Sequence, residues 1–318
     1  MERWPFGVLP PGGLERLGPH TIAYYATGYP YSNSAIVLGK DGVLVFDANI
    51  FHYARELKTA LTAEWPGGAA QLVISHSHAD HADGAMYFSP PAQTLASKFA
   101  QGRLAWWRAQ DQTARNSEYV DQYPNAAAWY RDFRMVVPER AVARRELIDL
   151  GGGVRVQLVP EAVAHTPGDL WAVVEPDGVG LCGDLWFNDC EPYLGSGSIE
   201  GSLDALDRLR AAGARTYLPG HGRAGMLQRN DPMVRYCLWV LEHVAAGMSR
   251  GLAGEQLRQA IRAEFDAQDA RPGEIRFAIT WKGALEDAVE AAEMAARGEP
   301  LYRNVQVVDI EAQPGPTP

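Results

Sequence analysis

The chain has 318 residues, 47% of them hydrophobic and 21% charged, and its formal net charge is −10. This composition is that of an ordinary globular protein with a sizeable core. The acidic surplus argues against a protein built to grip a nucleic-acid backbone. Apolar runs stay well short of the ~20 residues of a membrane span. We therefore expect neither nucleic acid nor membrane among its partners.

The location is expected to be cytoplasmic. The first residues lack the basic-then-apolar pattern of an export signal. Cys182, Cys190 and Cys237 are widely spaced and odd in number, which fits neither a zinc ribbon nor a disulfide framework. We interpret them as reduced thiols.

The first part of the chain alternates between strands and helices. The strand prediction over 34–46 contains Lys40-Asp41-Gly42, a tight-turn signal between two apolar runs, and Asp47 follows at its end. The other predicted elements are strands at 21–27, 71–75 and 94–97 and helices at about 52–64 and 81–88.

Residues 98–138 differ in character and look like a helical insertion rich in aromatic residues. They could fold over a site as a lid. Aromatic residues at helical spacing more often mean burial, so packing against the domain or a dimer contact is an equal alternative. The aromatic residues are Trp106, Trp107, Tyr119, Tyr123, Trp129, Tyr130 and Phe133.

Strand patterns return after the insertion, and helical patterns dominate beyond residue 231. Gly151-Gly152-Gly153 is interpreted as a hairpin turn. We expect one domain over 1–230, a helical extension over 231–305 that packs on it, and a disordered tail over 306–318. The predicted elements are strands at 146–150, 154–159, 170–175, 179–182 and 216–218 and helices at 203–212, 233–246, 253–265 and 281–297.

The stretch from Val73 to His81 carries the strongest chemical signal. His76, His78, Asp80 and His81 fall within six residues, directly after an apolar run that is typical of a buried strand. Imidazoles and carboxylates are the ligands that zinc and other first-row metals prefer. This spacing therefore predicts a metal site at the end of that strand.

Three further candidates follow predicted strands along the chain. His165 precedes Thr166-Pro167-Gly168-Asp169, Asp184 ends an apolar run, and His221 lies in Pro219-Gly220-His221-Gly222. Any one of these residues alone would more often be an ordinary core or surface residue. Strand ends are rigid platforms for ligands, and neighbouring glycines let the backbone approach a crowded centre. We expect Asp169 to have a structural role.

In this order and with these gaps, the seven residues resemble the metallo-β-lactamase-fold hydrolases over roughly residues 20–225. The resemblance implies an αββα sandwich, with two sheets face to face and helices on both outer sides. It implies one metal on His76, His78 and His165, and a second on Asp80, His81 and His221. Asp184 would bridge the two metals, and Asp47 would support the site from behind its ligands.

Such a site would make the protein a dinuclear metal hydrolase. Two ions, zinc by preference and iron or manganese as alternatives, would hold a bridging hydroxide that attacks a carbonyl. Asp80 is the candidate to orient this nucleophile and relay its proton. We expect a small ester, lactone, thioester or amide as substrate, with Trp186, Phe187 and Tyr193 lining the pocket.

Several alternatives stay open. The persulfide dioxygenases resemble this family and use one iron held by two histidines and an aspartate, although the residues of a second site favour two metals here. A phosphodiesterase or nuclease would need a basic surface, which the acidic balance disfavours. A metal-stabilised binding protein without turnover is a third possibility. A homodimer, formed through the insertion or the C-terminal helices, is also compatible with the sequence.

Overall fold

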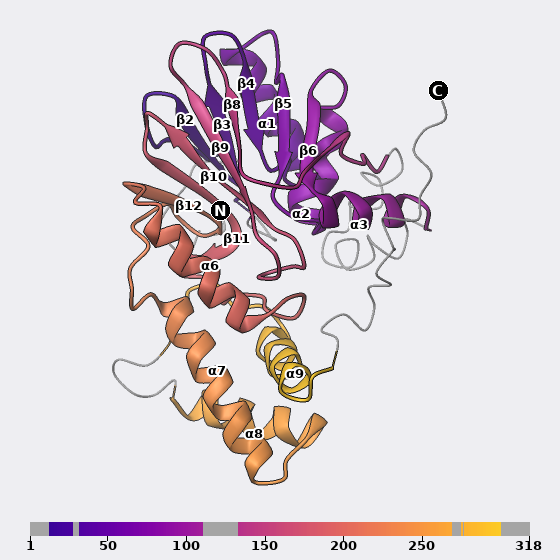
Figure 1. The fold of residues 1–318 in the computed structure, drawn as a ribbon, viewed down its shortest axis with the longest axis vertical. Coiled ribbons are helices and arrows are strands. Elements are labelled where there is room, and N and C mark those ends of the chain that lie inside the picture. Colours follow the sequence, from indigo (N-terminus) through magenta and orange to yellow (C-terminus); the bar gives the residue numbers. More distant parts are fainter. Residues whose placement is uncertain (1–12, 28–31, 111–132, 269–274, 276, 300–318) are drawn as a thin grey trace.

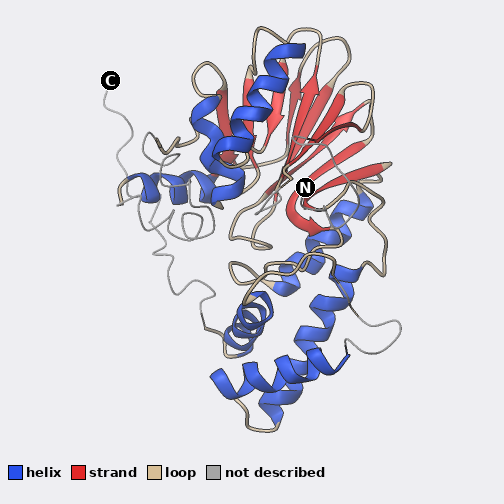
Figure 2. Cartoon of the chain, turned by 180° about the vertical axis from the view of Figure 1, so that it is seen from behind, coloured by secondary structure: helices blue, strands red, loops and turns tan. Residues whose placement is uncertain are grey.

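The computed structural model describes residues 13–27, 32–110, 133–268, 275 and 277–299. Two β-sheets lie face to face in the upper half of the molecule, and helices cover the outer face of each (Figure 1). Figure 2 shows the same layers from behind, with the C-terminal helices below the strands. This is the αββα sandwich that the resemblance implied.

The first sheet has seven strands, in the order β1-β2-β3-β4-β5-β6-β7. Neighbouring strands are antiparallel from β1 to β4 and parallel from β4 to β7. The sequence did not predict its two edge strands, β1 and β7, because both are short. The strands are β1 (Gly13–Arg16), β2 (Thr21–Tyr25), β3 (Asn33–Leu38), β4 (Val43–Phe46), β5 (Gln71–Ile74), β6 (Gln93–Ser97) and β7 (Arg140–Val142).

The second sheet has five strands, in the order β12-β11-β10-β9-β8, and only its β11–β12 pair is parallel. The predicted glycine turn joins β8 to β9. Gly151, Gly152 and Gly153 have φ values of 78°, 68° and 84°, which side-chain-bearing residues rarely adopt. The strands are β8 (Glu146–Asp149), β9 (Arg155–Pro160), β10 (Leu170–Glu175), β11 (Val179–Phe187) and β12 (Thr216–His221).

Both faces of β4 are covered, which explains why its apolar run is continuous. Leu44 and Phe46 face the second sheet, whereas Val43 and Val45 face the outer helices, and all four are buried. A strand with both faces covered has no polar side. Each such side chain contributes roughly 1.5–3 kcal/mol when fully buried. These contacts give the sandwich the rigidity that a site at its edge requires.

Helices α1, α2 and α3 cover the first sheet, and α6 covers the second (Figure 1). Helices α7, α8 and α9 continue the hydrophobic layer of α6 towards the lower half of the molecule. Among the residues that the structure describes, none of the helices combines the length and the hydrophobicity that a membrane span requires. The helices are α1 (Phe51–Glu64), α2 (Ala79–Ala82), α3 (Lys98–Arg108), α6 (Ile199–Ala211), α7 (Pro232–Ser249), α8 (Gly254–Gln268) and α9 (Ala284–Ala296).

Several expected boundaries differ from the structure. The predicted helix at 81–88 is the short α2 followed by the 3-10 helix η1 (Asp83–Tyr87). The strand predicted at 179–182 continues as β11 to Phe187. In the insertion, α3 is helical, residues 133–138 form no regular element, and 111–132 lie outside the described residues. The predicted tail at 306–318 lies outside them as well.

Candidate metal centre

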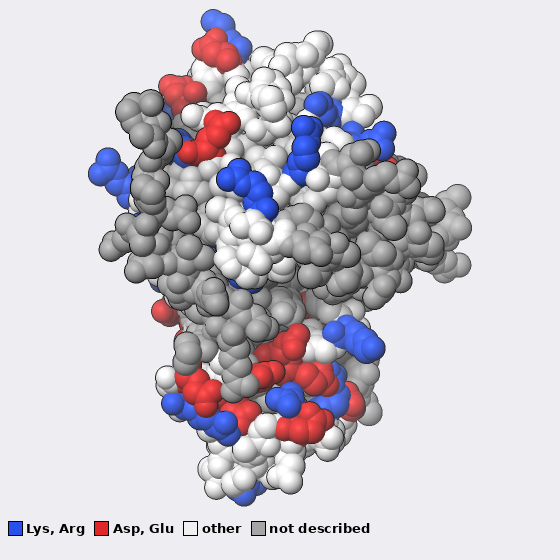
Figure 3. Space-filling view, turned by 90° about the vertical axis from the view of Figure 1, so that its right-hand side faces the viewer, with Lys and Arg blue, Asp and Glu red and all other residues white. Residues whose placement is uncertain are grey.

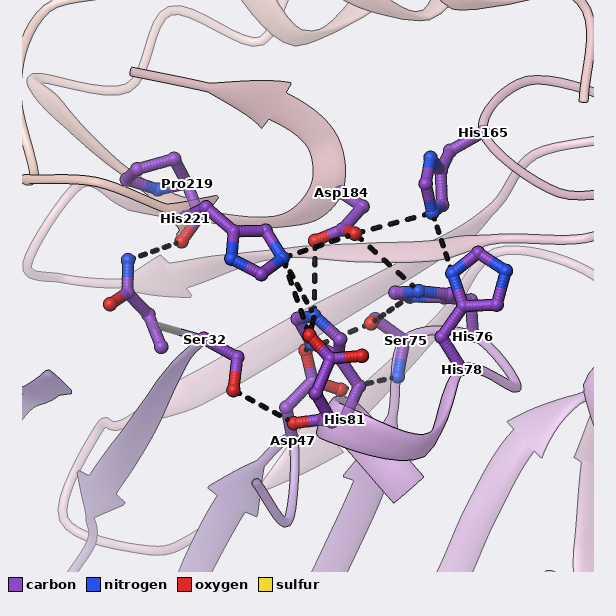
Figure 4. Close-up of polar contacts among 12 residues, drawn as sticks. Ser32, Asp47, Ser75, His76, His78, His81, His165, Asp184, Pro219 and His221 are labelled. Carbon is purple, nitrogen blue, oxygen red and sulfur yellow. Dashed lines mark hydrogen bonds and ion pairs between the residues drawn. The ribbon is translucent and has the colours of Figure 1, made fainter. Parts of the chain in front are cut away.

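The seven predicted ligands meet at one edge of the sandwich. His76 and His78 follow β5, Asp80 and His81 lie on α2, and Asp184 lies on β11. His165 comes from the loop between β9 and β10, and His221 ends β12. Figure 4 shows the imidazole rings and the Asp184 carboxylate turned towards one another from both sheets. The structure thus brings together residues that are up to 145 positions apart in the sequence, His76 and His221.

The first group consists of His76, His78, His165 and Asp184, whose ligand atoms all lie within 4.8 Å of one another. His165 Nε2 is 3.0 Å from His78 Nδ1 and 3.2 Å from Asp184 Oδ2. His76 Nε2 is 3.6 Å from the same carboxylate oxygen. Three imidazole nitrogens and one carboxylate therefore surround one small volume, as a four-coordinate metal requires.

The second group consists of Asp80, His81 and His221. Asp80 Oδ2 is 3.4 Å from Nε2 of both His81 and His221, and these two nitrogens are 3.4 Å apart. Asp184 also reaches this group, since its Oδ1 is 3.1 Å from His81 Nε2 and its Oδ2 is 3.4 Å from His221 Nε2. Asp184 therefore lies between the two groups.

Hydrogen bonds behind the rings determine which nitrogen faces the centre. His81 Nδ1 donates to Asp47 Oδ2 over 2.8 Å, and His165 Nδ1 donates to the Tyr193 carbonyl over 3.1 Å. Both rings then direct Nε2 inwards, and that of the neutral His165 is unprotonated. His78 is turned the other way. Its Nε2 lies 3.2 Å from Ser196 Oγ, so that Nδ1 faces the centre.

Asp47 connects the two groups from behind. Its carboxylate accepts hydrogen bonds from Ser75 N (2.7 Å), from Ser75 Oγ (2.8 Å) and from His81 Nδ1 (2.8 Å). Ser75 Oγ in turn lies 2.9 Å from His76 Nδ1, a ligand of the first group. Asp47 has a φ of 62°, a left-handed conformation that aspartate tolerates better than most residues. Asp47 thus contacts a residue of the second group directly and one of the first group through Ser75.

Burial keeps three histidines of the first group neutral. Desolvation, followed by the proximity of other histidines, lowers the pKa of His78 to about 3 and that of His76 well below its usual value. Desolvation also lowers the pKa of His165 to about 4, although Asp184 opposes this shift. Neutral imidazoles are the form that binds metal ions. The group is therefore ready to bind a metal at neutral pH.

The charged forms of Asp184 and His81 are favoured despite burial. Burial alone would raise the pKa of Asp184, but His81, His221, His165 and His76 together hold it well below its usual range. Burial likewise disfavours a charged His81, yet three carboxylates outweigh burial and raise the pKa of this histidine. In the absence of metal, a proton on His81 thus compensates charge that a cation would otherwise balance.

The donor set fits metal ions. His76 Nε2 is buried and has no hydrogen-bond partner among the described residues. His78 Nδ1 and His165 Nε2 face each other at 3.0 Å while their other ring nitrogens are engaged by Ser196 and the Tyr193 carbonyl. An orphaned buried acceptor such as His76 Nε2 is costly unless it gains a partner, and a cation would supply one. Nitrogen and carboxylate ligands suit zinc, and they also suit iron and manganese.

Backbone contacts fix the loop that carries His221. A Cβ on Gly220 would lie 1.9 Å from Asp184 Oδ1, so only glycine lets this loop approach the carboxylate. From the first sheet, the buried Asn33 donates to the carbonyls of Pro219 (3.0 Å) and Gly222 (2.7 Å). Both sheets thus hold the second group in place.

Two neighbouring residues support the remaining loops. Ser32 Oγ donates to the Asp80 carbonyl over 2.9 Å, which ties the first sheet to α2. The Asp169 carboxylate accepts hydrogen bonds from Thr166 N (3.0 Å) and from Thr166 Oγ1 (2.7 Å) and so closes the turn after His165. Desolvation raises the pKa of Asp169 to about 7.

The three expected pocket residues lie in different environments. Phe187 stacks on His221 with ring centroids 5.0 Å apart and an interplanar angle of 9°. Tyr193 is edge-on to His78 at 5.9 Å. Trp186 is 1% exposed and packs against Tyr217 in the core between the second sheet and its helices. Phe187 and Tyr193 thus border the centre, whereas the burial of Trp186 does not support a place in the pocket.

Sequence reasoning missed several residues that contact or support the centre, Ser32 among them. Ser75, Asn33 and Ser196 supply hydrogen bonds through small polar side chains that carry no motif. Trp281, whose ring is 5.5 Å from that of His221, falls within a predicted helix that in fact begins at Ala284. A tryptophan just before the helix-initiating Gly283 is a weak signal. Its contact with His221 depends on how the extension folds back.

Comparisons with known proteins show the fold and the family. A solved metallo-beta-lactamase from Pontibacter korlensis is similar in fold, with a TM-score of 0.52 and 17% identity over 67% of this chain and 93% of that one. TMB-1 is similar with a TM-score of 0.50 and 14% identity over 72% of this chain and 96% of that one. A search of the curated proteins found no match. The family model described as "Metallo-beta-lactamase superfamily" matches residues 28–221. Since this match takes in more than half of the sequence, the chain belongs to the metallo-beta-lactamase superfamily.

Proposed function

We propose that this protein is a hydrolase with two metal ions, zinc by preference, that cleaves a small and largely uncharged ester, lactone, thioester or amide. One observation carries the proposal. Seven ligand-type side chains converge into two adjoining groups, and Asp184 lies between them. When bound, two ions would lower the pKa of a water molecule towards ~7 and polarise the substrate carbonyl.

The chain's own residues then have distinct roles. His76, His78 and His165 would hold the first ion, and Asp80, His81 and His221 the second, with Asp184 shared. Asp80 Oδ2, 3.4 Å from both His81 and His221, would accept the proton of the attacking water and pass it to the leaving group. Phe187 and Tyr193 cover the histidines and would limit access of bulk water.

The short distances within the second group favour a dinuclear hydrolase over a mononuclear iron oxygenase. Its three ligand atoms are all buried and mutually 3.4 Å apart. A site built for one ion would have no need to place two histidines and a carboxylate there. We also propose a cytoplasmic location, because the three cysteines are free and buried.

Metal analysis combined with turnover tests the proposal. Protein purified without added metal should contain close to two equivalents of zinc, and it should hydrolyse chromogenic esters, lactones or thioesters. A chelator should abolish turnover, and added zinc should restore it. One equivalent of iron together with oxygen uptake in the presence of thiol substrates would reject the hydrolase.

A further inference from the structure

Residues 277–281, which precede α9, reach back to the metal centre. Residues 277–281 run beside the loop that follows β11. Ala278 N donates to the Asp189 carbonyl over 2.9 Å, and Glu191 N donates to the Ile279 carbonyl over 2.8 Å. The C-terminal extension is therefore joined to the loop that, a few residues later, carries Tyr193. It forms part of the surroundings of the centre as well as an outer layer.

Trp281 is held in place at the end of this segment. Its indole Nε1 donates to the Glu191 carbonyl over 2.6 Å, and its backbone N lies 3.3 Å from Glu191 Oε2. The Glu191 side chain is buried and also accepts a hydrogen bond from Tyr236 Oη on α7 over 3.1 Å. The Trp281 ring lies edge-on to His221 at 5.5 Å and 70°. An anchored aromatic ring thus stands beside a predicted metal ligand.

Trp281 also lines a cleft. The cleft has a volume of about 820 Å³ and is lined by residues of α8, of α9 and of the described chain just before α9. This volume is within the range of sites for small organic ligands, roughly 300–1,000 Å³. Its apolar lining consists of Phe265, Ile275, Phe277 and Trp281. Trp281 is therefore shared between the cleft and the surroundings of His221.

The charged residues of the lining are largely paired with one another. Arg262 on α8 binds Glu286 on α9 through two hydrogen bonds of 2.8 and 2.9 Å, and it lies 3.6 Å from Asp266. Lys282 is exposed to solvent. Figure 3 shows acidic and basic side chains interspersed over the lower half of one face, where the C-terminal helices lie. Among the described residues, the cleft therefore lacks an unpaired buried cation that would attract a carboxylate or phosphate.

We propose that this cleft binds an apolar acyl or aromatic group of an uncharged carbonyl substrate, and that Trp281 determines the specificity for this group. The proposal rests on the proposed hydrolase function, because it places the reacting carbonyl beside His221. Trp281 supplies a rigid apolar wall at low cost in side-chain entropy. Substrates with a long acyl chain then gain binding energy that substrates with a short chain lack.

Binding of an uncharged fluorescent probe, N-phenyl-1-naphthylamine, tests the cleft without turnover. The wild-type protein should bind it saturably, and Trp281→Ala should weaken binding roughly tenfold, since an aromatic contact surface is lost. Trp281→Phe should retain most of the affinity. Trp65→Ala is the matched control, because Trp65 is also partly buried but packs on the first sheet's helices. Metal content and circular dichroism should be unchanged in all variants.

Ester hydrolysis by the zinc-loaded protein gives the second readout. The ratio of kcat/KM for p-nitrophenyl octanoate to that for p-nitrophenyl acetate should fall roughly tenfold in Trp281→Ala. Trp281→Phe should restore most of the ratio. A uniform loss with both esters would mean that Trp281 supports folding rather than specificity, and would overturn the proposal.

The two readouts separate failure of the cleft from failure of the hydrolase. If no ester is cleaved but the probe binds in a Trp281-dependent manner, the hydrolase is wrong and the apolar cleft stands. If esters are cleaved but the probe binds equally well to Trp281→Ala, or not at all to the wild type, the cleft proposal is wrong.

Discussion

Asp47 and His81 are joined by a hydrogen bond of 2.8 Å between Oδ2 and Nδ1, and both side chains are buried. Asp47 comes from the loop after β4, and His81 from α2. The bond holds the His81 proton on Nδ1 and so leaves Nε2 to face Asp80 and Asp184. Replacing Asp47 should therefore alter metal binding although Asp47 itself is outside both ligand groups.

Asp47→Asn is expected to weaken metal binding about 10–100-fold, because supporting partners of metal-bound histidines have effects of this size. Titration against a chromophoric chelator measures the change. Asp149→Asn is the matched control, because exposed Asp149 accepts a backbone hydrogen bond from Gly151 far from the centre. An unchanged affinity in Asp47→Asn would contradict the role assigned to this bond.

His78→Ala is expected to remove the ion of the first group and to lower turnover on the order of 100-fold or more. His78 Nδ1 faces His165 Nε2 at 3.0 Å, so its loss opens one side of the group. Elemental analysis and ester turnover are the measurements. The control is His243→Gln, since His243 lies on α7 and bonds to the Trp239 carbonyl. A fully metallated and active His78→Ala protein would refute the ligand assignment.

Asn33→Ala is expected to weaken binding at the second group roughly tenfold while leaving the first group intact. The side chain donates to the carbonyls of Pro219 and Gly222, on both sides of His221, over 3.0 and 2.7 Å. Stepwise titration with zinc separates the two affinities.

The matched control for Asn33→Ala is Thr21→Val, which removes another buried bond between the sheets. Thr21 Oγ1 donates to Asp177 Oδ2 over 2.8 Å. Losing it should reduce the free energy of unfolding by about 1 kcal/mol with both zinc affinities unchanged. If the two variants lose metal equally, Asn33 acts only through general stability.

Gly220→Ala is expected to abolish binding of both ions, because its Cβ would lie 1.9 Å from Oδ1 of the shared Asp184. Gly225→Ala, in the same stretch of chain, would place its Cβ 3.4 Å or more from its nearest neighbours and should be tolerated. Elemental analysis of both variants makes the comparison. Normal metal content in Gly220→Ala would show that the loop can move away from Asp184.

Acid should destabilise the metal-free protein. The pKa of buried His165 is lowered from 6.5 to about 4. Between these values the unfolded chain binds more protons than the folded protein, so the free energy of unfolding falls as pH decreases from 6.5 towards 4. Above pH 6.5, His165 is neutral in both the folded and the unfolded state, and the free energy of unfolding is at its full value. Acidification to pH 4 removes at most about 3 kcal/mol of this free energy through His165.

Urea unfolding of chelator-treated protein across this pH range is the measurement for His165. His165→Gln should lose less stability on acidification than the wild type, because glutamine does not titrate. His243→Gln, which replaces a partly exposed histidine on α7, should retain the wild-type slope. Equal slopes for all three proteins would mean that His165 keeps an ordinary pKa when folded.

The apolar runs and the ligand motif by themselves determine much of this protein. Continuous apolar runs such as Val43–Phe46 predict strands that are covered on both faces, and the structure has β4 there. The residues from His76 to His81 predict a metal site because their spacing after a strand confines them to one small volume. Local physics suffices for these conclusions, since only neighbours along the chain take part.

Contacts between segments that are distant in the sequence are evident only in the tertiary structure. That Asn33 supports the loop of His221, and that Trp281 stands beside it, depends on packing of the two sheets and of the C-terminal extension. Trp186 is predicted to line the pocket because it follows Asp184, yet β11 continues past residue 182 and turns the Trp186 ring into the core. The pairing of β11 with β12 shifts register between Gly183 and Phe187, so the regular alternation of side chains along a strand does not put Trp186 on the same face as Asp184. Only the pairing of strands that are distant in the sequence decides this.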